Sequence, residues 1–166
     1  MATRSDQHNV EEMAAQLADR LISAVAETLA QRSPEPGRER VSATLAIGRA
    51  AEPEGDGRTT RLMVTLILIR WLSVARAKLD DEPDRVERAL GWVEEALGKR
   101  YRARARYTAP VLQSEEGATE ILQYRDALGD DFLPSLVWLL AGVVAADAEG
   151  DVGWLAALVG VDYDAS

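Results

Sequence analysis

Hydrophobic residues recur at spacings of three and four along most of the chain, which is the pattern of amphipathic helices. The first helical stretch follows Asn9, which matches a capping box together with Glu12 three residues later. It ends before the proline-rich segment 33–37. Further helical stretches are expected at 59–79, 83–97, 114–128, 132–146 and 151–160. The segment from Lys99 to Pro110 carries no such pattern and is expected to be irregular. The chain is therefore predicted to be all-α, with six or seven helices packed as antiparallel pairs.

The stretch that follows the prolines fits two patterns. Every second residue from Val41 to Ile47 is apolar, as in a strand, whereas Val41, Leu45 and Gly48 share one face of a helix. The helical neighbours favour a helix. The alternative is an α+β fold with one hairpin at 41–69.

Two segments are expected to form the centre of the protein. Residues 62–69 are apolar on nearly every side of a helix, which is typical of a buried helix, and residues 136–144 are similarly apolar. Leu66 is accordingly expected in the core, where an aspartate would destroy the fold.

Two parts of the sequence resemble each other. Trp71-Leu72 and the acidic residues up to Asp84 are matched, at the same offsets, by Trp138-Leu139 and the acidic residues up to Asp151. Each part is expected to form a helix, an acidic turn and a shorter helix, with the tryptophans packed in the core. The similarity is either a degenerate repeat of a helical hairpin or chance.

Length and composition predict one domain, 9–161, between flexible tails at 1–8 and 162–166. The 166 residues contain no cysteine, which excludes disulfides, zinc–thiolate sites and thiol nucleophiles. The longest uncharged runs are shorter than the ~18 apolar residues of a membrane span. A cytoplasmic protein without membrane contact is expected.

No residue is predicted to be catalytic, metal-binding or cofactor-binding. The sole histidine, His8, lies in the expected tail, where it cannot be held against a substrate. The acidic turn 147–151 lacks the glycine and the closing acid of a calcium loop. Gly55 and Gly57 are not followed by the Lys-Ser/Thr of a phosphate-binding loop. An enzyme is therefore not expected.

A basic stretch is the sharpest anomaly in a chain whose net charge is -9. Its cations and flanking tyrosines form the predicted partner-binding site, which comprises Lys99, Arg100, Tyr101, Arg102, Arg104, Arg106 and Tyr107. Three uses fit this composition: ion pairing within the protein or between subunits, docking of an acidic protein, and binding of single-stranded nucleic acid.

These observations favour a non-enzymatic helical interaction protein, namely an adaptor, an assembly factor or a subunit of a larger complex. Its partner would be another protein, a further copy of itself, or both. The alternative is a nucleic-acid-associated protein that uses the stretch 99–107, and a metal-dependent hydrolase with acidic ligands is a more distant one.

Overall fold

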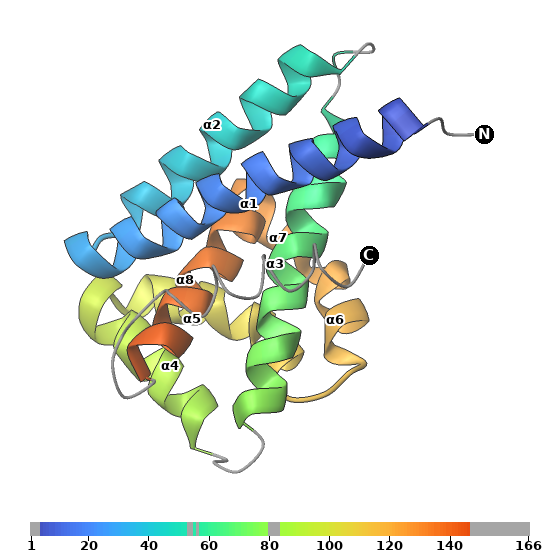
Figure 1. Ribbon diagram of the computed structural model, residues 1–166. Coiled ribbons are helices and arrows are strands. Elements are labelled where there is room, and N and C mark those ends of the chain that lie inside the picture. The colour runs from blue at the N-terminus through green and yellow to red at the C-terminus, as the bar shows by residue number, and fades with distance from the viewer. Residues whose placement is uncertain (1–3, 53–54, 56, 80–83, 147–166) are drawn as a thin grey trace.

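The computed structural model describes residues 4–52, 55, 57–79 and 84–146, and the elements in these ranges are all helical (Figure 1). Six of these helices have ten residues or more: α1 (Arg4–Gln31), α2 (Glu35–Ala51), α3 (Arg58–Leu79), α4 (Arg85–Leu97), α5 (Lys99–Thr108) and α8 (Phe132–Ala146). The all-α prediction is confirmed. The alternative hairpin at 41–69 is wrong, because its two halves lie in α2 and α3.

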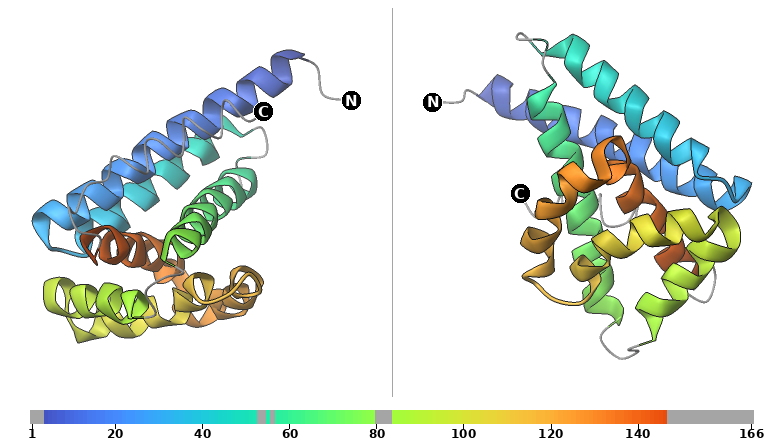
Figure 2. Two further views of the ribbon diagram at one scale, coloured as in Figure 1. Left: turned by 60° about the horizontal axis from the view of Figure 1, so that its bottom comes forward. Right: turned by 180° about the vertical axis from the view of Figure 1, so that it is seen from behind.

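Helix α8 lies in the core of the protein, as expected for its apolar sequence. Residues from Phe132 to Val144 are all buried, because helices surround α8 on several sides. Figure 2 shows α1 and α2 side by side on one side of α8, and α4 and α5 on the other. The stretch 117–146 is apolar and long enough to cross a membrane, but most of its apolar part is buried within the protein. Such burial is typical of the core helix of a soluble protein.

The proline-rich segment separates α1 from α2 as predicted, but both helices begin earlier than expected. Helix α2 starts at Glu35, because Pro36 is compatible with the first turn of a helix. Helix α1 starts at Arg4, so residues 4–8 of the expected tail are helical.

Helix α3 is buried on one face only, which corrects the expectation of a helix buried all round. Val64, Leu68 and Leu72 face the core, whereas Leu62 and Leu66 are 59% and 57% exposed. An apolar sequence shows which residues prefer to be buried, but it does not show how many neighbours a helix will have.

A hydrogen bond to a carboxylate connects the end of α2 to the beginning of α3. Glu52 Oε1 accepts a hydrogen bond of 2.8 Å from the backbone N–H of Thr60, in the first turn of α3. Gly48 lies so close to Thr60 that a Cβ on the glycine would be 1.9 Å from the threonine hydroxyl oxygen. The end of α2 therefore packs directly on the beginning of α3.

The connection from α4 to α8 differs from the prediction at two points. Lys99–Thr108 is helix α5 and not an irregular segment, because Gly98, at φ +119°, turns the chain without interrupting helical structure for long. The single helix expected at 114–128 is instead a series of short pieces. These are α6 (Gly117–Glu120), η2 (Ile121–Tyr124) and α7 (Arg125–Leu128), and they lie between the short helices η1 (Ala109–Leu112) and η3 (Gly129–Asp131).

The second half of the proposed repeat continues into residues 147–166, which lie outside the described residues. The expected helix 151–160 and tail 162–166 belong to the same segment. Trp71 and Trp138 are both buried in the core, as expected, and Trp92 is half-buried. Trp154 also lies outside the described ranges.

Candidate interaction surfaces

Helix α5 divides the residues of the predicted site between two faces. One face of α5 lines a groove through Lys99, Arg102, Arg106 and Tyr107, together with Tyr124. The three cations lie at spacings of three and four residues along the helix. The groove has a volume of about 570 Å³. The rings of Tyr107 and Tyr124 lie 5.2 Å apart at an angle of 55°. This surface, the α5 groove, brings four of the seven predicted residues together with the ring of Tyr124.

Two of the cations in the α5 groove are paired within the protein. Arg102 forms ion pairs with Glu94 and with Glu87, the latter at 3.1 Å. Arg106 lies 3.7 Å from the same Glu87 carboxylate. Because these acids belong to α4, the pairs join two consecutive helices.

The other face of α5 contributes to an internal network. Arg104 Nε donates a hydrogen bond of 2.7 Å to Asp131, whose carboxylate also accepts two bonds from Arg38, at 3.0 and 3.1 Å. The hydrogen bond from Arg38 is the main cause that lowers the pKa of Asp131 and raises that of Arg38. Arg104 is thus joined to Asp131 within the fold.

Aromatic rings cover the same network. The Arg38 guanidinium lies 5.2 Å from the ring centre of Tyr101 and 5.5 Å from that of Trp138. The Trp138 indole N–H in turn donates to the carbonyl oxygen of Pro34, at 3.1 Å. Tyr101 therefore helps to join α2, α5 and α8. Of the seven predicted residues, Lys99 and Arg100 are exposed cations without an ion pair in the described structure.

A second surface, which the sequence analysis did not predict, is an apolar groove along α3. Leu62, Leu66 and Ile69 line it from α3, and Leu122 lines it from η2. The groove has a volume of about 780 Å³, and Leu122 is 37% exposed. The spacing of four and then three residues on α3 is the pattern by which one helix packs against another. We call this surface the α3 seam.

Charged residues of both signs border the α3 seam. Arg61 of α3 and Arg125 of α7 are exposed at its edges, and Asp126 and Asp130 lie beside them. Arg125 Nε donates to the carbonyl oxygen of Leu122 at 3.3 Å, which leaves its terminal nitrogens available.

The described residues contain no group of three or more histidine, aspartate or glutamate side chains that could hold a metal ion. His8 lies in α1 and not in a tail. The acidic turn 147–151 is outside the described part of the chain.

The chain matches no model of a protein family, and neither the curated proteins nor the solved structures contain a significant match to it.

Proposed function

We propose that this chain is a non-enzymatic interaction protein, an adaptor, assembly factor or subunit of a complex, and that its α3 seam binds a helix of another protein. It would act in the cytoplasm. The observation that carries the proposal is the clustering of Leu62, Leu66 and Leu122, which are three exposed large apolar residues in one groove. Contiguous apolar surface of this kind is typical of a docking site, whereas single exposed leucines are ordinary.

The geometry of the seam favours an amphipathic helix as its occupant. Leu62, Leu66 and Ile69 span two turns of α3 and offer the ridge that a second helix needs for packing. A partner helix with large apolar residues at matching spacing would bury these leucines. Helix-in-groove recognition works through such anchors at positions i, i+4 and i+7.

The charges at the border favour acidic residues beside the partner's apolar stripe. Arg61 and Arg125 line the groove from two different helices, α3 and α7. Acidic side chains of the partner would meet these arginines at the rim. Rim charges contribute orientation and association rate more than affinity.

Helical peptides test this proposal directly. We expect a labelled peptide with leucines at i, i+4 and i+7 and flanking glutamates to bind the protein more tightly than the same peptide with lysines, measured by fluorescence anisotropy. Leu66→Asp should abolish binding. Ile47→Asp is the matched control, because Ile47 is 45% exposed on α2 and lies outside the seam.

Two results would contradict the proposal. Equal binding of the peptide by wild type and Leu66→Asp would show that the seam is not used. A wild-type dimer that Leu66→Asp dissociates, measured by light scattering, would identify a second copy as the occupant. Affinity capture from the native host, with wild type and Leu66→Asp as baits, would then identify the natural partner.

The second candidate function is nucleic-acid binding through the α5 groove. The paired rings of Tyr107 and Tyr124 beside Lys99 favour it, because bases stack on aromatic residues while cations neutralise phosphates. The engagement of Arg102 and Arg106 by acids of α4 weakens it. A labelled single strand that binds wild type and not Tyr107→Ala would establish it.

A further inference from the structure

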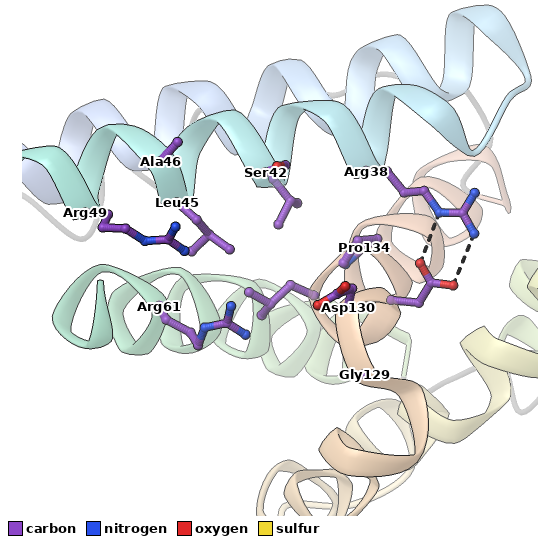
Figure 3. A pocket seen from close by; sticks show the side chains of 12 residues that line it. Arg38, Ser42, Leu45, Ala46, Arg49, Arg61, Gly129, Asp130 and Pro134 are labelled. Atoms are coloured by element: carbon purple, nitrogen blue, oxygen red, sulfur yellow. Dashed lines mark hydrogen bonds and ion pairs between the residues drawn. The ribbon is translucent and has the colours of Figure 1, made fainter. Parts of the chain in front are cut away.

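A third concave surface lies between α2, α3 and the beginning of α8, and Figure 3 shows it from close by. We call it the arginine cleft. Its volume of about 410 Å³ is in the range of sites for small molecules. Arg38, Arg49 and Arg61 line it, against the acids Asp130 and Asp131. In a chain of net charge -9, this cleft is locally basic.

The three arginines differ in what they bind. Arg38 is committed to Asp131 by two hydrogen bonds. The side chains of Arg49 and Arg61 are exposed, and neither has a hydrogen bond or ion pair with any described residue. In Figure 3 both extend into the gap between α2 and α3, in the direction of Asp130. No side chain in the described ranges therefore engages either of these two guanidinium groups at the cleft.

Gly57 brings these two arginines to the same end of the cleft. A Cβ placed on Gly57, which has φ +72°, would lie 3.5 Å from Cβ and Nε of Arg49, so the arginine passes directly over this residue. The backbone N–H of Arg61 donates to the Gly57 carbonyl at 2.9 Å, one turn further along. Both arginines carry positive charge, and an anion that lies between two cations is attracted by each of them.

The floor of the cleft is apolar. Val41, Leu133 and Pro134 are buried beneath it, and Leu45 is half-buried at its side. A bare inorganic ion would leave this surface uncovered, whereas an anion with an apolar body would cover it.

We infer that the arginine cleft binds a small organic oxyanion, in which a carboxylate or phosphate group lies between Arg49 and Arg61 and an apolar body rests on Leu45 and Pro134. Guanidinium groups bind both kinds of oxyanion through charge-assisted hydrogen bonds. The arginine cleft shares Arg61 with the α3 seam, whereas Arg49 and Pro134 line the cleft and do not line the seam.

Calorimetric titration of the full chain with phenyl phosphate, benzoate, inorganic phosphate and benzyl alcohol tests the inference. We expect one equivalent of phenyl phosphate or benzoate to bind, with inorganic phosphate weaker and the neutral alcohol undetectable. The stronger of the two aromatic anions shows whether phosphate or carboxylate is preferred. Arg49→Gln and Arg61→Gln should each weaken binding about tenfold, because each removes a charge-assisted hydrogen bond.

Arg100→Gln is the control, since Arg100 is an exposed arginine of α5 without an ion pair among the described residues. It removes the same charge and should leave binding unchanged. Equal weakening by Arg100→Gln, or equal binding of benzyl alcohol, would overturn the inference. Arg49→Gln should not alter the binding of helical peptides to the α3 seam, so failure of either proposal can be recognised separately.

Discussion

Arg38 and Asp131 are 93 positions apart in the chain, yet the arginine binds both carboxylate oxygens of the aspartate, at 3.0 and 3.1 Å. The pair joins the first turn of α2 to the turn that precedes α8. Asp131 also accepts a hydrogen bond from Arg104, so one carboxylate connects three helical segments.

Arg38→Gln should lower the free energy of unfolding by about 1–3 kcal/mol, because it breaks two charge-assisted hydrogen bonds in a half-buried setting. Chemical denaturation measures the loss. Arg40→Gln is a matched control, since Arg40 binds Glu27 with similar geometry on an exposed surface and should change stability much less. Equal effects of the two substitutions would contradict a structural role of the Arg38 pair.

The same pair predicts a pH dependence. The hydrogen bond from Arg38 lowers the pKa of Asp131 below its usual value of 3.8, so the folded state favours the ionised carboxylate. This contribution is fully present above the unfolded-state pKa, and it is lost as the pH falls through the lowered pKa of the folded state. The stability difference between wild type and Asp131→Asn should therefore shrink below about pH 4. A difference that stays constant down to pH 2 would be inconsistent with the pairing.

Leu66 and Leu68 should respond differently to the same substitution. Leu66→Asp should leave the helical circular dichroism and the unfolding temperature nearly unchanged, because the side chain is exposed. Leu68→Asp should prevent folding, because it places an unpaired carboxylate in the core. If Leu66→Asp unfolds the protein, the outward face of α3 is buried in solution.

Gly142 of α8 and Gly91 of α4 should also respond in opposite directions to the same substitution. Gly142→Ala should destabilise the protein, because the added Cβ would lie 2.4 Å from the carbonyl oxygen of Ala89 and backbone cannot easily yield. Gly91→Ala meets no atom within 4 Å and should stabilise α4 by up to about 1 kcal/mol. Thermal unfolding of both variants measures the contrast.

Helix boundaries could be predicted where a residue imposes a local conformation. Gly98 ends α4 because it adopts φ +119°, which other residues rarely reach, and Pro34 lies between α1 and α2 because its ring fixes φ and removes the backbone N–H. The core helix α8 could be predicted because it is apolar on every side. Which helices pack around α8 could not be predicted from that pattern.

The candidate sites depended on long-range placement and were harder to predict. The basic stretch was visible in the sequence, but nothing near Arg104 indicated that its partner would be Asp131. The α3 seam was missed because Leu66 looks the same in sequence whether a helix covers it or not. The arginine cleft combines Arg49 and Arg61 from two helices, and no local pattern relates them.

The position of α8 in the chain has a consequence for biosynthesis. Translation delivers α1 to α5 before α8, although each of these helices packs on α8 directly or through a neighbour. Until residue 144 has left the ribosome, side chains such as Leu21, Leu72 and Leu90, fully buried in the finished protein, lack the surface that covers them. Exposed apolar surface of this kind makes partly synthesised chains prone to aggregation. The nascent chain should therefore depend on chaperones until α8 has been synthesised, and α1 to α5 should reach their final packing only after α8 has left the ribosome.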